Sequence, residues 1–124
     1  MTQEELKERF KQFALAIVQF ADALPDIILY RNTKYQLIKS GTSSAANYRA
    51  ACRRKSGKDF IAKLGIVEEE LDETLFWLEF IVGQSNEWRT AIAPLWKEGN
   101  ELLAITVSSI KTSRKNQKKP PRNP

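Results

Sequence analysis

The sequence predicts an all-α protein, an antiparallel up-down-up-down bundle of four helices. Apolar residues recur at steps of three and four along four long segments, as they do on one face of an α-helix. Short stretches rich in Pro, Gly, Ser or Asn separate these segments, and short connections make consecutive helices antiparallel. No segment shows sustained strand alternation or an Asn-Gly or Asp-Gly hairpin turn. At 124 residues the chain fits one domain with one core.

The first helix is expected over residues 2–24. Thr2 and Glu5 have the spacing of a capping box, in which each side chain accepts a hydrogen bond from the other residue's backbone N–H. Pro25 stops the helix, because proline disfavours the helical conformation in the residue before it. A single apolar stripe follows the cap: Leu6, Phe10, Phe13, Ile17, Phe20 and Leu24.

The second helix is expected from Thr33, acting as its N-cap, to about residue 54. Before it, residues 26–32 are interpreted as a connection with a buried apolar patch. This patch comprises Ile27, Ile28 and Leu29.

Small residues predict that the second helix packs closely against a neighbour. Residues 40–46 are rich in Gly, Ala and Ser, which weakens the helix but lets another backbone approach. Ser43 and Asn47 lie four residues apart and could bond to another helix or to a ligand, and a polar contact with another helix is expected. The inner face is expected to hold Leu37, Gly41, Ser44, Tyr48 and Cys52.

The third and fourth helices have the clearest periodicity. Ser56 and Asp59 open the third helix, whose heptad positions are Phe60, Leu64, Val67, Leu71, Thr74, Leu78 and Ile81. A turn over residues 83–86 follows. The fourth helix is expected from about residue 87, and its apolar side carries Ile92, Leu95, Gly99, Leu102, Leu103, Thr106 and Ile110.

Residues 1–111 are expected to form the bundle and residues 112–124 a disordered, basic, proline-containing tail. The whole net charge of +5 comes from this tail, because the first 111 residues contain as many acids as bases. The tail either solubilises the protein or attracts nucleic acid. Its basic residues are Arg114, Lys115, Lys118, Lys119 and Arg122.

Charge is strongly polarised along the chain. Residues 31–63 contain nine bases and one acid, whereas residues 68–79 contain six acids and no base. One interpretation is that the end of the second helix binds nucleic-acid phosphates. The alternative is that this basic region pairs with the acidic helix of a neighbouring subunit. The candidate phosphate-binding residues are Arg49, Arg53, Arg54, Lys55 and Lys58, together with the tail residues Arg114, Lys115, Lys118 and Lys119.

The third helix has apolar residues outside its heptad stripe. A helix that is apolar nearly all round needs a second partner, which favours a subunit interface over an aromatic ligand cage. The candidate interface residues are Ile66, Phe76, Trp77 and Phe80 on the third helix, with Trp88 and Trp96 further on.

No catalytic or cofactor motif is present. The chain has no histidine and one cysteine, so it lacks the Glu-x-x-His pairs of di-metal bundles and a base to activate Cys52. It also lacks a glycine-rich phosphate loop and a nucleophile elbow. We therefore expect a non-enzymatic protein without cofactor or metal. With no run of about 18 apolar residues and no secretory signal, we expect it to be soluble and cytoplasmic.

Residues 36–81 resemble the family of four-helix-bundle proteins from 23S rRNA intervening sequences. The resemblance rests on Ser40, Thr42-Ser43 and Asn47, on the basic Arg53-Arg54-Lys55, and on the next junction, Ser56-Gly57-Lys58-Asp59-Phe60-Ile61, followed by a leucine-rich acidic helix. The family usually has a Glu-Gly pair where this chain has Arg49-Ala50-Ala51-Cys52. A positive charge thus replaces a negative one.

The resemblance implies a small bacterial bundle that assembles into a homo-oligomeric ring, often a pentamer, without established catalysis. The accessory protein of diversity-generating retroelements is a similar protein, which works with a reverse transcriptase and RNA. This similarity implies RNA, DNA or a reverse transcriptase as partners. The leading hypothesis is a self-assembling scaffold or binding protein, and the alternative is a nucleic-acid-binding accessory protein.

Overall fold

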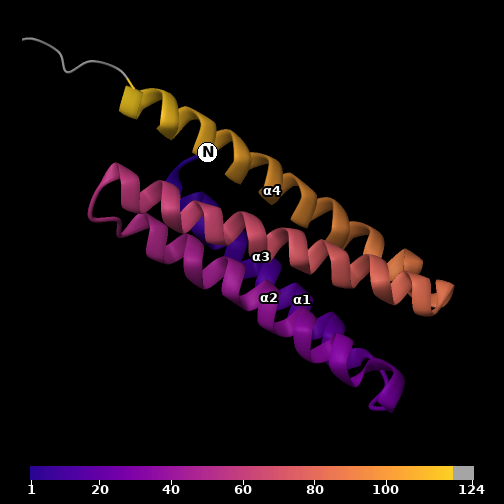
Figure 1. Cartoon of the computed structure of the whole chain (residues 1–124). Coiled ribbons are helices and arrows are strands. Elements are labelled where there is room, and N and C mark those ends of the chain that lie inside the picture. The colour runs from indigo at the N-terminus through magenta and orange to yellow at the C-terminus, as the bar shows by residue number, and fades with distance from the viewer. Residues whose placement is uncertain (119–124) are drawn as a thin grey trace, which may run out of the picture.

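The computed structural model describes residues 1–118, which form four long helices. These are α1 (Gln3–Ala23), α2 (Ile28–Cys52), α3 (Gly57–Gln84) and α4 (Arg89–Lys118), with a 3₁₀ turn, η1 (Asn86–Trp88), before α4. Consecutive helices pack against each other in antiparallel directions, and no strand occurs within residues 1–118 (Figure 1). The predicted class, all-α with up-down connectivity, is confirmed.

The predicted caps of α1 and α3 are confirmed. Thr2 Oγ1 accepts a hydrogen bond from the Glu5 backbone N–H at 3.1 Å, and the Glu5 carboxylate accepts one from the Thr2 N–H at 3.4 Å. Ser56 Oγ accepts from the Asp59 N–H at 3.1 Å. These bonds satisfy N–H groups that the first turn of a helix leaves unpaired.

The predicted start of α2 is wrong. The helix begins at Ile28 rather than after Thr33, and Thr33 is buried inside it. Helical periodicity from Ile28 turns Tyr30, Thr33 and Leu37 toward the core, so the preceding apolar residues face outward. The patch expected to be buried is instead exposed: Ile27 by 47%, Ile28 by 82% and Leu29 by 50%.

The small-residue face of α2 packs closely against a neighbour, as expected, and it does so against both α1 and α3. A Cβ atom added to Gly41 would lie 2.8 Å from Ile17 Cγ2 of α1. On the other side, Thr74 of α3 donates a hydrogen bond to Ser40 Oγ at 2.8 Å, and both hydroxyls are buried. The small side chains therefore permit close approach on two sides at once.

The predicted polar contact to another helix is wrong for Asn47 but not for Ser43, whose side chain hydrogen-bonds to Glu70 of α3 and counteracts the rise in the pKa of that carboxyl group. Asn47 Nδ2 donates to the carbonyl and hydroxyl oxygens of Ser43, at 2.9 and 3.0 Å, within α2. The hydroxyl pair that does bridge two helices is Ser40 with Thr74. Four of the five residues expected on the inner face of α2 are buried, and Cys52 is half-buried.

The heptad stripe of α3 forms the centre of the core. All of its positions from Leu64 to Ile81 are buried, whereas Phe60, at the end of the bundle, is half-buried. In α4, Ile92, Gly99, Leu102, Thr106 and Ile110 are buried as expected, while Leu95 and Leu103 are half-buried.

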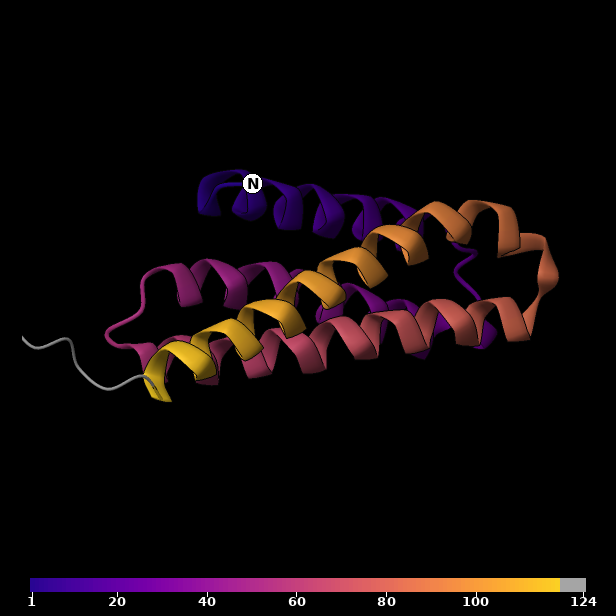
Figure 2. The same cartoon turned by 90° about the horizontal axis from the view of Figure 1, so that it is seen from above.

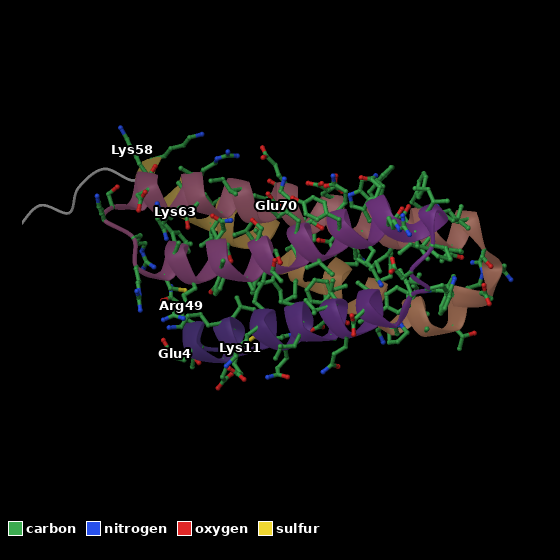
Figure 3. The ribbon with its side chains drawn as sticks, turned by 90° about the horizontal axis from the view of Figure 1, so that it is seen from below. Glu4, Lys11, Arg49, Lys58, Lys63 and Glu70 are labelled. Atoms are coloured by element: carbon green, nitrogen blue, oxygen red, sulfur yellow. The ribbon has the colours of Figure 1, made fainter. Side chains whose placement is uncertain are left out.

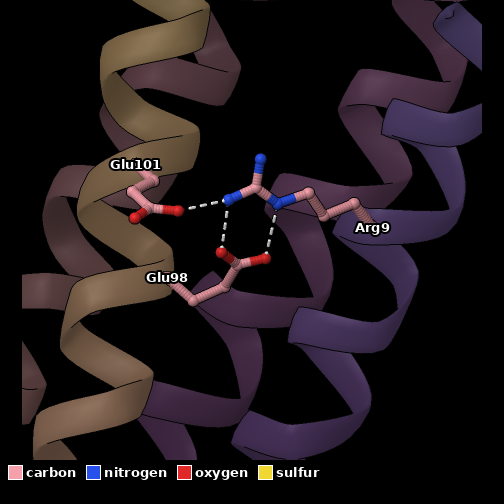
Figure 4. A network of polar contacts seen from close by, with 3 residues as sticks. All are labelled: Arg9, Glu98 and Glu101. Atoms are coloured by element: carbon pink, nitrogen blue, oxygen red, sulfur yellow. Dashed lines mark hydrogen bonds and ion pairs between the residues drawn. The ribbon is translucent and has the colours of Figure 1, made fainter. Parts of the chain in front are cut away.

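An ion-pair network joins α1 to α4, which have the least backbone contact among the helix pairs that touch. The Arg9 guanidinium donates to both carboxylate oxygens of Glu98, at 2.6 and 2.8 Å, and to Glu101 at 2.5 Å (Figure 4). These carboxylates raise the pKa of Arg9 above its ordinary value, although burial opposes them. Beyond this network α4 crosses toward α3 and away from the start of α1 (Figure 2).

The bundle extends further along the sequence than expected. α4 continues through Lys118, so residues 112–118 are helical and not part of a disordered tail. Lys111, Arg114, Lys115 and Lys118 recur at steps of three and four, so they share one face of the helix. The remainder of the predicted tail, including Lys119, lies outside the described residues.

We predict that Gly41→Ala lowers the free energy of unfolding by about 1–3 kcal/mol, because the new methyl group overpacks the Ile17 side chain. Gly65→Ala is the matched control. A Cβ at Gly65 meets nothing within 4 Å, so this substitution should stabilise α3 by up to about 1 kcal/mol. Urea unfolding of the two variants measures both effects. Equal effects would contradict the close approach of α1 and α2.

Candidate functional site

The fold brings two basic segments to the same end of the bundle. The end of α2, the start of α3 and the last turns of α4 meet there, and a Cβ at Gly57 would lie 2.7 Å from Gln117 Nε2. Figure 3 shows Arg49, Lys58 and Lys63 toward this end, with Glu70 further along α3. We call this region the basic end. It is defined by Arg49, Arg53, Arg54, Lys55, Lys58, Lys63, Lys111, Arg114, Lys115 and Lys118.

A depression of about 390 Å³ lies between α2 and α3 at the basic end. Four cations and one carboxylate line it, together with two alanines that leave room for a ligand. No ion pair to Arg49 or Arg53 occurs within residues 1–118. The lining residues are Ala46, Arg49, Ala50, Arg53, Lys55, Asp59 and Lys63.

The one carboxylate in this depression is already engaged. Asp59 accepts hydrogen bonds from Lys63 Nζ at 2.9 Å and from the Lys55 backbone N–H at 3.1 Å. These two partners, Lys63 first, lower the pKa of Asp59 below its ordinary value. The carboxylate thus stays ionised near neutral pH and offsets one of the four positive charges.

Arg54 and Lys58 lie apart from this depression. The Arg54 guanidinium lies over the Phe60 ring, 4.4 Å from its centre, which is a cation–π contact. Lys58 is exposed in the first turn of α3. The structure therefore places the five predicted basic residues at one end of the molecule, but only Arg49, Arg53 and Lys55 share a depression.

A second basic depression, of about 420 Å³, lies along the last turns of α4. It contains the predicted residues Arg114, Lys115 and Lys118. Sequence reasoning missed Lys111 and Lys63, which line the two depressions. A signal for Lys111 was present in the sequence, because Lys111, Arg114, Lys115 and Lys118 have the spacing of one helical face.

The outer face of α3 carries an exposed apolar cluster. Phe76, Trp77 and Phe80 contact one another, with ring centres 4.9 to 5.9 Å apart. Phe76 is 53% exposed and Phe80 44%, and Ile66 is exposed on the same face about three to four turns earlier. We call Ile66, Phe76, Trp77 and Phe80 the outer α3 cluster.

The two other predicted interface residues differ from this cluster. Trp88 packs within the bundle, edge-on to Phe20 and Tyr30, and its Nε1 donates to the Tyr30 hydroxyl at 3.0 Å. Trp96 is 37% exposed on α4, and its Nε1 donates to Glu79 at 3.0 Å. Trp96 therefore borders α3, whereas Trp88 mainly stabilises the bundle.

Acidic side chains surround the outer α3 cluster. Glu69 and Glu73 are exposed on its face, and Glu73 accepts a hydrogen bond from Trp77 Nε1 at 3.4 Å. Burial raises the pKa of Glu70, and repulsion by Glu73 adds to this effect. The face is thus both apolar and negative. In contrast, α2 contains no Asp or Glu along its whole length.

Residues 1–118 offer neither a metal-binding cluster nor a membrane-spanning helix. No group of three or more His, Cys, Asp or Glu side chains in this range is arranged to hold a metal ion. None of its helices combines the length and the apolar character that crossing a membrane requires.

A comparison with known protein structures shows to which family this chain belongs. No protein-family profile matches the sequence, and no curated protein matches it. The structure is similar to the crystal structure of a protein of unknown function from the S23 ribosomal protein family of Bacteroides thetaiotaomicron. The TM-score is 0.79 and the sequence identity 30%, over 90% of this chain and 99% of that chain. The chain belongs to the S23 ribosomal protein family.

This S23-family membership confirms the resemblance to 23S rRNA intervening-sequence proteins that residues 36–81 indicated. The similarity extends to most of the S23-family chain. The family relative has no known function, so the role of this S23-family protein has to be argued from its own surfaces.

We predict that Asp59→Asn destabilises the protein at pH 7 and not at low pH. A carboxyl group whose pKa is lowered by folding stabilises the folded state above its unfolded pKa of about 3.9. That stabilisation is lost as the pH falls through the lower folded value. Urea unfolding of both proteins at pH 7 and at about pH 3 should show a difference that shrinks on acidification. A difference independent of pH would show that Asp59 acts by packing alone.

Proposed function

We propose that this protein is a non-enzymatic, self-assembling binding protein whose subunits meet through the outer α3 cluster. The observation that carries the proposal is a cluster of contacting aromatic rings on this face, in which Phe76 is 53% and Phe80 44% exposed. Contiguous exposed apolar surface of this kind is typical of interfaces, where aromatic residues are enriched.

Charge complementarity supports a second copy of the chain as the partner. The outer face of α3 carries Glu69 and Glu73, whereas α2 carries the exposed Lys39 and no acid along its length. Contact between two different faces is heterologous, and such contacts close into rings when the rotation between subunits permits. Opposite charges around an apolar centre also fix the register of the two helices.

We predict that Phe80→Glu reduces the oligomeric mass, because it adds a charge to an apolar face that already carries two carboxylates. Light scattering measures the mass, and circular dichroism checks that the helices persist. Leu15→Glu is the matched control, since it adds the same charge to an apolar residue that is 45% exposed on α1, a helix without backbone contact to α3. An unchanged mass for Phe80→Glu would contradict this interface.

A second function, nucleic-acid binding, is supported by a separate observation. The fold joins the predicted basic segments of α2 and α4 into one basic end with ten cations; Asp59 lines one of its two depressions, and Glu4 and Glu8 of α1 line a neighbouring depression with Arg49. Cations grouped in this way bind phosphates and release counterions, which makes the binding strongly salt-dependent. An accessory role beside a reverse transcriptase would use this same surface.

We predict that Arg53→Glu weakens nucleic-acid binding and makes its salt dependence less steep. The slope of log affinity against log salt should fall by about one for each phosphate that the variant no longer neutralises. Fluorescence anisotropy with a labelled RNA at several salt concentrations measures both the affinity and the slope. Arg31→Glu makes the same charge change about 33 Å away along α2 and is the control.

The two functions can be separated with these variants. A fall in oligomeric mass for Arg53→Glu, with RNA affinity unchanged, would assign Arg53 to the subunit interface instead. Equal loss of RNA affinity in Arg53→Glu and Arg31→Glu would mean that only total charge matters.

A further inference from the structure

A groove of about 370 Å³ lies beside the basic end, between the first residues of α1 and the last turns of α4. It exists because α4 leaves α1 beyond the Arg9 network and crosses toward α3 (Figure 2). The apolar part of its lining comprises Leu6, Tyr48, Phe60 and Ile105. Its α4 wall comprises Ser108, Ser109, Thr112 and Ser113.

The lining of this groove suits a flat group with polar edges. The Tyr48 ring is held by stacking on Phe10, with ring centres 4.6 Å apart and planes 7° apart. Phe60 carries the Arg54 guanidinium on its face. An apolar site with a few well-placed hydrogen-bonding groups and a volume of a few hundred Å³ is typical of pockets for small planar ligands.

Cations adjoin the groove along one edge. The basic depression of α4 shares Ser108 and Thr112 with the groove, and its other lining residues are Lys111, Arg114, Lys115 and Lys118. A ligand that fits both the groove and the basic depression needs a planar, hydrogen-bonding part for the groove and negative charges for the cations beside it. A nucleotide within a strand has both features, because its base lies beside a phosphate on either side.

We propose that the groove holds one unpaired base of a single-stranded RNA or DNA, while the neighbouring phosphates contact the cationic stripe of α4. The proposal rests on nucleic-acid binding at the basic end and names the kind of strand that binds there. A base in a duplex is stacked and paired, so its face and its edge cannot enter such a groove. Single strands present both, and aromatic and guanidinium groups commonly receive them.

The groove can be tested with a strand that keeps its phosphates and lacks its bases. Fluorescence anisotropy would compare a labelled strand of about 12 nucleotides with an abasic strand of the same length, at one low and one moderate salt concentration. We expect the abasic strand to bind about tenfold more weakly, because each base that stacks contributes to affinity. A duplex of the same length should also bind more weakly than the intact strand, although it carries more phosphates. Measuring the strand once as RNA and once as DNA shows which of the two nucleic acids the groove prefers.

Ser109→Trp tests the position of the base, because an indole at this half-buried site fills the groove. We expect this variant to bind the intact strand as weakly as the abasic one, and to bind the abasic strand as the natural protein does. Ala91→Trp is the matched control, since it adds the same side chain to an exposed site in the first turn of α4, at the other end of the bundle.

The outcomes separate this proposal from the one on which it rests. Equal affinity for intact and abasic strands would overturn the base-binding groove and leave phosphate binding at the basic end standing. Competition by oligoglutamate of equal charge, as strong as that of the unlabelled strand, would also overturn it. If neither strand binds at low salt, both proposals are wrong. The comparison of strands needs no variant, so it stands even if Ser109→Trp fails to fold.

Discussion

The close approach of α2 to both of its neighbours governs how the other helices can be arranged. Gly41 admits Ile17 of α1, and Ser40 bonds to Thr74 of α3. Larger side chains at these positions would separate the helices and leave the interior loosely packed. Small and apolar residues of α2 face inward, and its charged residues face outward. The face proposed to bind partners is thus a consequence of the face that packs.

Antiparallel connectivity explains why a basic end forms at all. Since α2 and α4 run in the same direction, their C-terminal turns lie at the same end of the bundle (Figure 1). Arg49 lies in the last turn of α2, and Lys115 and Lys118 lie in the last turn of α4. Cations there interact favourably with the negative ends of the helix dipoles. The same arrangement places positive charge where both depressions and the groove open, so one feature of the fold contributes to stability and to the proposed binding surface.

The exposed surface has two regions of different chemistry. The outer α3 cluster is apolar with carboxylates around it, which suits a protein partner and repels phosphates. The basic end is cationic, with an aromatic and hydroxyl-lined groove beside it. Trp88 shows why aromatic content alone does not locate an interface. Its ring and its N–H are engaged by Phe20 and Tyr30 inside the bundle, whereas Phe76 and Phe80 remain exposed.

Local patterns in the chain were enough to predict the class, the number of helices, two N-caps and the buried stripe of α3. These features follow from periodicity and from side chains three or four residues apart. The same patterns misplaced the start of α2, the helical end of α4 and the partner of Asn47, because propensity does not show which face a neighbouring helix will cover. The packing of the helices was needed to show that Arg53 and Lys115 share one end, and that a groove separates Ser109 from Leu6. Such contacts depend on the crossing of helices distant in the chain, which no local pattern specifies.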